Sequence, residues 1–264
     1  MRTIALRLAY DGTDFSGWQT QAGGHSGHPK GQPRTVQGCL EAALARIHKR
    51  PVAVNAAGRT DAGVHAAGQV AAFDTDIESM EPERFLPALN SILPRDVRIL
   101  ESRPERPGFH ARFDARARTY RYFFIPGRQV LPHESRYALH LRLRPDIALL
   151  NAYCRLLAGE MDCSIFAAAG DSSLVRGGSP CRNIHRALFL VQGDRLVFEI
   201  AANAFLWKMV RSVAGTLLHY EGLGTPPGEL ADIIASCDRK LAGPTIPPQG
   251  LFLWKVSYPV DVAG

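Results

Sequence analysis

The sequence predicts an α+β fold of two ferredoxin-like halves, each with the element order β-α-β-β-α-β. Three observations predict it: strand-like alternation of apolar residues, helix-like apolar spacing between the strands, and a repeat of that order in the second half. We expect largely antiparallel sheets joined around a central basic cleft, with the helices on the other side. The expected subdomains are residues 1–112 and 113–264.

The first half is predicted to contain four strands and two helices. In chain order they are strand 4–10, helix 36–47, strands 52–57 and 68–74, helix 82–93 and strand 97–102. The first strand ends at the turn pair Asp11-Gly12. The second helix can begin at Pro82 because a first turn tolerates proline, whereas Pro87 is expected to shorten or kink it. Residues 22–34 are rich in Gly, Pro and His without apolar periodicity, and we interpret them as a surface loop.

The second half is predicted to follow the same order and to end with a further helix and strand. In chain order the elements are strand 119–125, helix 145–157, strands 183–192 and 195–202, a helix around 206–217, a helix around 228–237 and strand 251–258. The first of the last two helices is predicted by one apolar face, which consists of Leu206, Met209, Val210, Val213 and Leu217. Gly159 follows the end of the helix over 145–157 and is expected to stop it.

Arginine dominates the basic residues. Of 31 Lys and Arg residues only five are lysine, and the net charge is +6. Arginine binds phosphate bidentately and stacks on bases, so this bias favours a nucleic-acid partner, although a GC-rich genome produces the same bias. Seven arginines fall close together: Arg103, Arg106, Arg112, Arg116, Arg118, Arg121 and Arg128. We expect this run to hold substrate phosphates; a solvated strand face is the alternative for several of its members.

Several classes of protein are disfavoured by the composition. Arg2 and Arg7 interrupt the N-terminal apolar run, which therefore does not resemble a signal peptide, and no stretch is apolar for long enough to cross a bilayer. The five cysteines are odd in number and form no CxxC pair, which favours a reducing cytoplasm. The histidines considered as metal ligands are His25, His28, His48 and His65. Because no cysteine or carboxylate lies near them at ligand spacing, we expect no metal.

A polar loop between the second and third expected strands contains the candidate chemistry. Its sequence is Ala57-Gly58-Arg59-Thr60-Asp61-Ala62-Gly63-Val64-His65. Arg59 can place a cation beside Asp61 and keep the carboxylate ionised even when it is partly buried. An ionised, oriented carboxylate can attack carbon. The spacing alone also fits a simpler role, in which Asp61 caps a turn and Arg59 is its surface partner.

This loop, with Gly68-Gln69-Val70 after it, resembles the signature of TruA-type pseudouridine synthases. Six further blocks are similar to that family in the same order along the chain. They are Tyr10–Phe15 with Gly17–Gln19, Arg34–Gly38, Phe109–Phe113, Arg118–Tyr122, Ala202–Phe205 with Met209–Arg211, and Ala242–Thr245 with Gly250–Leu253. Residues 163–180 match the family pattern only in part. The resemblance implies the pseudouridine synthase fold and an isomerisation, without a cofactor, of uridines 38 to 40 in the anticodon arm of tRNA.

The resemblance also implies roles for individual residues. Asp61 is the nucleophile, which adds to C1′ of the ribose or to C6 of the uracil, or else assists a glycal-like intermediate. The uridine is flipped out of the RNA, and Arg59 fills the space that it leaves. Tyr120 stacks on the flipped uracil and assists proton movement from C5, whereas Leu251 packs on the opposite face. Arg211 pairs with the catalytic aspartate.

The remaining expectations concern partners and rival functions. Arg112, Arg118, Arg121 and Lys208 complete the expected substrate-binding set. Family members work as homodimers that share one tRNA, so some arginines can serve the partner's site. The loop at 22–34 is longer than the short segment that family members usually have at this place. A lid that contacts RNA is the alternative to a plain surface loop. From the residues alone, Tyr120 also fits a sheet aromatic and Leu251 a core strand residue.

Two rival functions compete with an isomerase. One is a non-catalytic RNA-binding protein of the same fold, and the other is a hydrolase that uses Asp61 as its nucleophile. A degenerate binder has no reason to keep Asp61 together with Arg59, Tyr120 and Arg211. A hydrolase needs a water-activating base, and none is evident in the sequence. The complete set of residues therefore favours the isomerase.

Overall fold

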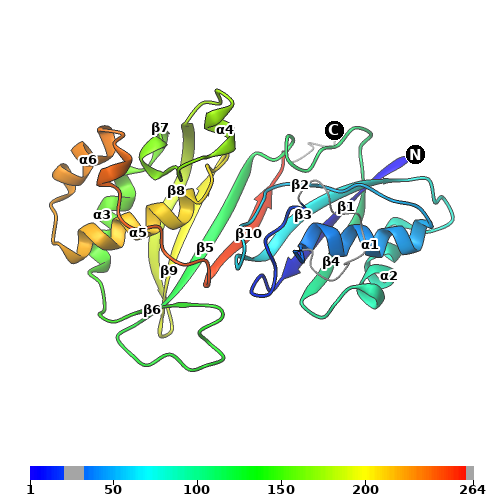
Figure 1. Ribbon diagram of the computed structural model, residues 1–264, viewed down its shortest axis with the longest axis horizontal. Helices are drawn as coiled ribbons and strands as arrows, with labels where there is room; N and C mark the ends of the chain where they lie inside the picture. The colour runs from blue at the N-terminus through cyan, green and yellow to red at the C-terminus, as the bar shows by residue number, and fades with distance from the viewer. Residues whose placement is uncertain (21–32, 260–264) are drawn as a thin grey trace. The chain divides into compact units, whose positions relative to one another are not determined.

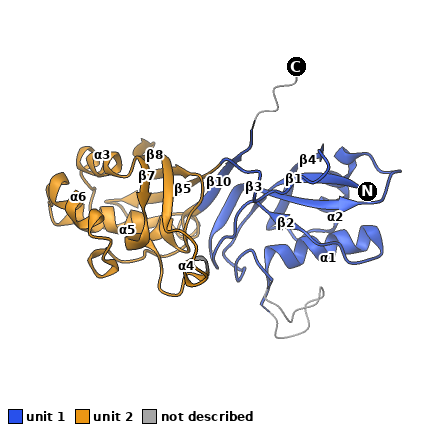
Figure 2. Cartoon of the chain, turned by 90° about the horizontal axis from the view of Figure 1, so that it is seen from above, with its two compact units in different colours: residues 1–116, 252–264 blue, residues 117–251 orange. Residues whose placement is uncertain are grey.

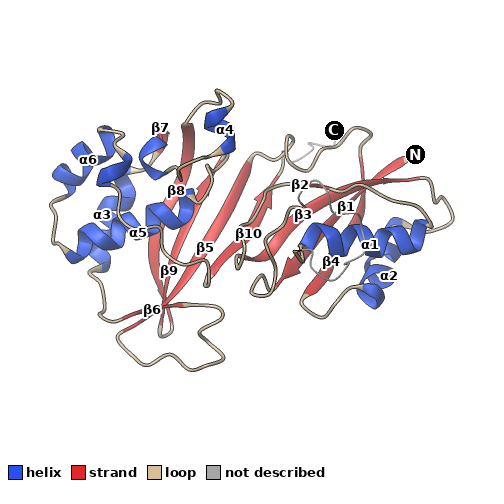
Figure 3. Ribbon diagram, in the orientation of Figure 1, coloured by secondary structure: helices blue, strands red, loops and turns tan. Residues whose placement is uncertain are grey.

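The computed structural model describes residues 1–20 and 33–259, and Figure 1 labels the helices and strands. The chain divides into two compact units (Figure 2): unit 1 is Met1–Arg116 with Phe252–Gly264, and unit 2 is Ala117–Leu251. Both units mix helices with strands (Figure 3), so the predicted α+β class is confirmed. Over the described ranges, no helix is both long enough and apolar enough to cross a membrane.

Unit 1 has the predicted element order. It contains β1 (Arg2–Tyr10), α1 (Val36–His48), β2 (Asn55–Ala56), β3 (His65–Thr75), a 3₁₀ turn (Pro82–Arg84), α2 (Phe85–Ile92) and β4 (Val97–Glu105), with β10 (Leu251–Ser257) returning from the C-terminal end. The sheet order is β4-β1-β3-β10, and β2 pairs with β3. All these pairings are antiparallel except that of β10 with β3, which is parallel and places Phe252 opposite His65.

The two faces of β1 pack against different partners. Ile4 lies opposite Phe73 of β3, and Phe73 contacts His48 of α1 and Phe85 of α2. The predicted alternating face of β1 is therefore the helix-covered face of the sheet. Ala5, on the other face, joins a smaller apolar cluster whose other members are Ala57, Val70, Ala72, Phe109 and Ala111.

Two predicted elements of unit 1 are shorter than expected. Strand 52–57 is only two residues long, because the Val54 N–H donates to the Glu41 side chain of α1 (3.2 Å) instead of to a neighbouring strand. Pro87 shortens the second helix, as predicted. Proline cannot make the α-helical hydrogen bond to the residue four before it, so the preceding residues form the 3₁₀ turn and α2 begins at Phe85.

Unit 2 is built on an antiparallel sheet with the order β5-β9-β8-β7. Its elements are β5 (Ala117–Pro126), β6 (Leu139–Leu141), α3 (Ile147–Leu156), β7 (Gly159–Asp162), a 3₁₀ turn (Ser164–Phe166), α4 (Ser172–Val175), β8 (Cys181–Gln192), β9 (Arg195–Ala202), α5 (Met209–Gly222), α6 (Pro227–Ala235) and a 3₁₀ turn (Arg239–Leu241). β6 pairs with β5 in parallel. Helix α3 contacts β8, α5 and α6.

The differences in unit 2 have local causes. β6, β7 and α4 were not predicted, since three or four residues are too few to show a period. Leu206 was predicted on a helix but precedes α5. The helix starts only at Met209 because Lys208 has a left-handed backbone (φ 58°).

Candidate active site

Residues 57–64 connect β2 to β3 and carry Asp61. The Asp61 side chain is half-buried, Arg59 is exposed, and Thr60 between them is buried. The Val64 N–H donates to the Asp61 carbonyl (3.1 Å), which closes a turn around the aspartate. We call residues 57–64 the aspartate loop. The loop thus presents a carboxylate at the surface of unit 1, with its backbone folded back below.

The chain that leaves β1, residues 10–18, holds the aspartate loop. The Tyr10 hydroxyl and the Thr60 hydroxyl share a buried hydrogen bond of 2.8 Å, and the Trp18 N–H donates to the Thr60 carbonyl (3.0 Å). Two glycines allow this close approach. A Cβ on Gly12 would lie 2.0 Å from the Val64 carbonyl oxygen, and one on Gly17 (φ 98°) would lie 2.7 Å from the Thr60 carbonyl oxygen. Real Cβ atoms do not approach oxygen so closely, so larger residues do not fit there.

Uncharged groups lie beneath the loop. Burial raises the pKa of Tyr10 well above its ordinary value, so the hydroxyl stays neutral at any physiological pH. The Gln69 amide of β3 donates to the Gly58 carbonyl (2.8 Å) and helps to satisfy the backbone of the loop. These neutral contacts fix the loop without adding charge below the carboxylate.

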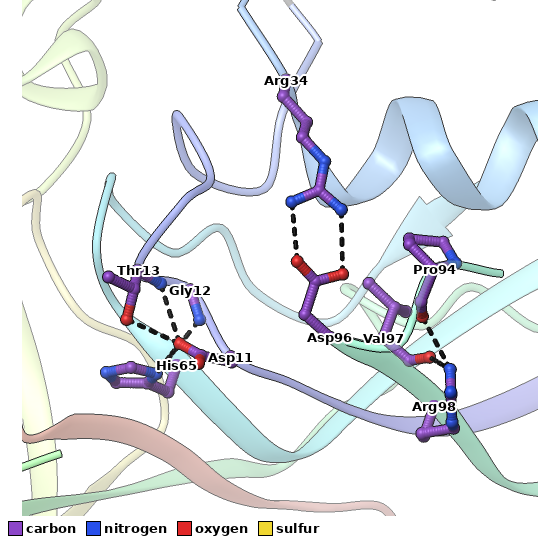
Figure 4. A network of polar contacts seen from close by, with 9 residues as sticks. All are labelled: Asp11, Gly12, Thr13, Arg34, His65, Pro94, Asp96, Val97 and Arg98. Carbon is purple, nitrogen blue, oxygen red and sulfur yellow. Dashed lines mark hydrogen bonds and ion pairs between the residues drawn. The ribbon is translucent and has the colours of Figure 1, made fainter. Parts of the chain in front are cut away.

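His65, the first residue of β3, ties the end of the aspartate loop to the end of β1. Figure 4 shows its Nδ1 accepting from the Gly12 N–H (3.0 Å), with the Asp11 carboxylate 3.2 Å from the same nitrogen. Asp11 also accepts from the N–H and hydroxyl of Thr13. The ring of Phe252 from β10 stacks on His65 at 4.6 Å. His65 is therefore a supporting residue of the loop.

An ion pair between Arg34 and Asp96 also anchors residues 10–18, the segment that holds the aspartate loop. Arg34 donates two hydrogen bonds of 2.7 and 2.8 Å to the Asp96 carboxylate (Figure 4). Its Cζ lies 4.0 Å from the centre of the Phe15 ring. The Asp96 carbonyl accepts from the Asp11 N–H (3.0 Å). Asp96 raises the pKa of Arg34, which keeps the guanidinium charged. Sequence reasoning missed these supporting residues because their importance depends on contacts over long sequence distances.

The other predicted residues on β5 lie in unit 2, on two different faces of the strand. Tyr120 is 8% exposed and meets Phe205 edge to face at 5.1 Å. Arg118 shares its face and donates to the Asn203 carbonyl (2.7 Å). Arg121 points to the opposite face and pairs with Glu199 on β9 at 2.7 Å. The structure therefore brings Arg118 and Tyr120 together and separates Arg121 from them.

Arg211, Lys208 and Leu251 also belong to unit 2. Nε of Arg211 donates to the Ile246 carbonyl (2.7 Å), and the neighbouring Pro247 carbonyl accepts from the Tyr122 hydroxyl. Nζ of Lys208 lies 4.2 Å from the ring centre of Trp207. Leu251 is 4% exposed at the start of β10. The aspartate of unit 1 and these residues thus come from separate compact units.

The arginines of the run form ion pairs with more carboxylates than the two within the run itself. The ion pairs are Arg103 with Glu101 and Glu105, Arg106 with Asp114, Arg121 with Glu199, and Arg128 with Glu134 and Asp194. Only Glu105 and Asp114 lie within the run itself. Arg112 and Arg116 are exposed.

The histidines considered as metal ligands have other roles where they are described. His48 contacts the Leu44 carbonyl and the Thr75 hydroxyl, and His65 supports the aspartate loop. His25 and His28, with most of the 22–34 loop, lie outside the described residues. Within the described ranges no group of three or more His, Cys, Asp or Glu side chains is arranged to hold a metal ion.

Comparison with known proteins covers nearly the whole chain. The family model described as tRNA pseudouridine synthase matches residues 8–114 and 153–259. A tRNA pseudouridine synthase A from Treponema denticola is 51% identical over 263 residues, which is 99% of this chain and 94% of the relative. The tRNA pseudouridine synthase A from Treponema pallidum is 46% identical and covers 92% of this chain and 84% of the relative. The one from Methylococcus capsulatus is 42% identical and covers 98% of this chain and 90% of the relative.

Proposed function

The chain belongs to the tRNA pseudouridine synthase A family, and from this premise we propose that it converts uridine to pseudouridine at positions 38 to 40 of tRNA. The reaction breaks the N1–C1′ bond, rotates the uracil and forms a C5–C1′ bond. The proton leaves C5 and N1 gains one, so there is no net redox change. Acid–base groups and one nucleophile are sufficient, and no cofactor is required.

Asp61 is the proposed nucleophile, and the observation that carries the proposal is its position on the aspartate loop. A half-buried carboxylate on a loop fixed by Tyr10, Trp18 and Gln69 is already oriented before the substrate arrives. Addition to C1′, addition to C6 and formation of a glycal each need such an oriented carboxylate. The exposed Arg59 beside it is suited to enter the base stack once the uridine has flipped.

Residues of unit 2 complete the proposed site. Tyr120 stacks on the flipped uracil and assists the proton that leaves C5, and Leu251 covers the opposite face of the ring. Arg211 pairs with Asp61. Arg112, Arg118, Arg121 and Lys208 contact the RNA. Tyr120 and Arg118 share one face of β5, which supports a site that combines an aromatic ring with a cation.

The finer architecture is part of the same proposal. Two ferredoxin-like halves frame a basic cleft, with residues 1–112 supplying the aspartate loop and residues 113–264 supplying most of the uracil contacts. The active form is a homodimer that binds the anticodon arm of tRNA in the cytoplasm. The cysteines of the described chain form no disulfide, which fits a reducing compartment.

The experiment uses purified protein and an unmodified tRNA transcript, with pseudouridine mapped by position. We expect Asp61→Asn and Asp61→Ala to lower the rate by about 10⁴-fold or more, because the nucleophile is lost. RNA affinity should stay near that of the wild type. Asp232→Asn, which changes an exposed aspartate on α6, is the matched control and should be fully active.

The outcomes separate the enzyme from its rivals. Full activity of Asp61→Ala refutes the assignment of the nucleophile. Tight tRNA binding by a wild-type protein that forms no pseudouridine favours the non-catalytic RNA-binding protein of the same fold. Release of free uracil from the transcript would indicate the hydrolase.

A further inference from the structure

Phe113 is an exposed aromatic residue with no role in the proposed reaction. Its side chain is 75% exposed, whereas Phe109, four residues earlier, is 7% exposed. A single exposed apolar residue is common on protein surfaces and by itself indicates no site. The turn that carries Phe113, however, is anchored by several hydrogen bonds, and His110 and Arg112 lie beside the ring.

Buried residues fix the turn to the face of unit 1 that lies opposite α1 and α2. Phe109 and Ala111 belong to the small apolar cluster on that face, and the Phe109 ring packs on Tyr258 at 5.2 Å. The Ala111 N–H donates to the Asn55 side chain, and the Ala111 carbonyl accepts from the Tyr258 hydroxyl, both at 2.7 Å. Both backbone polar groups of Ala111 are therefore satisfied.

Residues 110–114 close on themselves as well. The His110 N–H donates to the Asp114 carboxylate (2.8 Å), and the Asp114 N–H donates to the His110 carbonyl (3.0 Å). Arg106 pairs with the same carboxylate at 2.9 Å. A turn held at both ends loses little conformational entropy when its exposed side chain meets a ligand.

The surroundings of Phe113 suit a nucleotide. The His110 ring lies 4.3 Å from the Phe113 ring, and Cζ of Arg112 lies 5.8 Å from its centre. Proteins that bind unpaired RNA combine an aromatic face, on which a base stacks, with cations for the neighbouring phosphates.

The anchor also connects this turn to the aspartate loop. Asn55, which holds Ala111, lies in β2, and Ala57, which packs in the same cluster, is the first residue of the aspartate loop. Both segments lie within unit 1, so the position of Phe113 is fixed with respect to the base of that loop.

We propose that Phe113 stacks on an unpaired base of the substrate RNA near the target uridine, while Arg112 binds an adjacent phosphate. This inference rests on the proposed function, since it deepens the way in which the same enzyme holds its tRNA. Phe113 is then a specificity residue that selects RNA whose neighbouring base is free to stack.

The test measures the affinity of the full-length protein for an unmodified anticodon-arm transcript at several salt concentrations. We expect Phe113→Leu to weaken binding about tenfold, because a stacked base is lost although the apolar volume is nearly kept. Phe113→Trp should bind within about twofold of the wild type. Leu143→Ala, at an 81% exposed apolar residue of unit 2, is the matched control and should not change affinity.

Salt dependence separates the two contacts. The slope of log Kd against log salt should be unchanged in Phe113→Leu, because stacking releases no counterions. In Arg112→Gln the slope should fall by about one. Unchanged tRNA affinity in Phe113→Leu overturns the proposal. A shift in oligomeric state in that variant, with RNA affinity intact, also overturns it and indicates a protein contact.

The proposed function can fail independently of this inference. If the wild-type protein binds the transcript but forms no pseudouridine, the enzymatic assignment fails. Weaker binding by Phe113→Leu in that case would still establish the stacking contact.

Discussion

Two loops of this protein are held in opposite ways. The aspartate loop of unit 1 is fixed by close backbone approach and by neutral buried hydrogen bonds. The loop that follows β5 in unit 2 is fixed by Arg128, which pairs with Glu134 and with Asp194 from the β8–β9 turn. Contacts of the first kind do not depend on salt or pH, whereas those of the second kind do. The difference teaches that the direct contacts of the aspartate loop depend on shape and neutral hydrogen bonds, whereas ion pairs such as Arg34–Asp96 act one step further from it.

Among the variants that test this comparison, Gly12→Ala should have the largest effect, because it removes the close approach that fixes the aspartate loop. The new Cβ would overlap the Val64 carbonyl, so the end of β1 or the start of β3 has to move. We expect the free energy of unfolding to fall by about 3 kcal/mol. We also expect the rate of pseudouridine formation to fall, because the aspartate loop is displaced. Urea unfolding and a single-turnover assay measure the two effects.

The matched control for this change is Gly228→Ala on α6. A Cβ there meets nothing within 4 Å, and alanine is the better helix former, so stability should rise by up to about 1 kcal/mol. Equal urea midpoints for the two alanine variants would show that the steric argument is wrong.

A middle-sized effect is expected from Tyr10→Phe, which removes the hydroxyl below the aspartate loop. Thr60 loses a buried hydrogen-bond partner, at a cost of about 1–2 kcal/mol. If Tyr10 positions the loop, kcat should fall while KM for tRNA stays the same. Tyr220→Phe removes an exposed hydroxyl that bonds the Leu241 carbonyl and should change neither constant. Similar kinetics in both variants would remove Tyr10 from the support of the loop.

The smallest effect concerns the charged loop of unit 2 and its dependence on pH. Arg128 lowers the pKa of Glu134 from 4.5 to about 2 in the folded protein. A lowered carboxyl pKa contributes stability above the unfolded value, and the contribution is lost as the pH falls toward the folded value. In Glu134→Gln, the deficit in urea midpoint relative to the wild type should therefore be present at pH 6 and shrink between pH 4.5 and 2. A deficit of constant size at all these pH values would contradict the comparison.

The sequence was most informative where the structure depends on neighbours along the chain. Alternation identified the helix-covered face of β1, and Pro87 predicted the shortened α2. The aspartate loop was recognisable by its resemblance to a family signature, since its spacing alone also fits an aspartate that caps a turn. The shortness of β2 could not be predicted, since the Val54 N–H is satisfied by a side chain of α1.

Charge partners were the least predictable feature. Glu199 is 78 residues from Arg121, and Asp194 is 66 residues from Arg128, so no local count of acids could include them. Strand register decides such pairs, because Arg121 lies directly opposite Glu199 in the β5–β9 ladder. The supporting contacts of Tyr10 and His65 were missed for the same reason. The pairing of Asp61 with Arg211 and the role of Tyr120 stay predictions.

The parallel pairing of β10 with β3 has a consequence for biosynthesis. Phe252, which stacks on His65, is translated only after the whole of unit 2, whereas Met1–Arg116 of unit 1 are translated before it. During synthesis of unit 2, the nascent chain therefore exposes one edge of an unfinished sheet beside the aspartate loop. Maturation of this loop is thus coupled to the synthesis of unit 2, because the ring that stacks on His65 follows unit 2 in the chain.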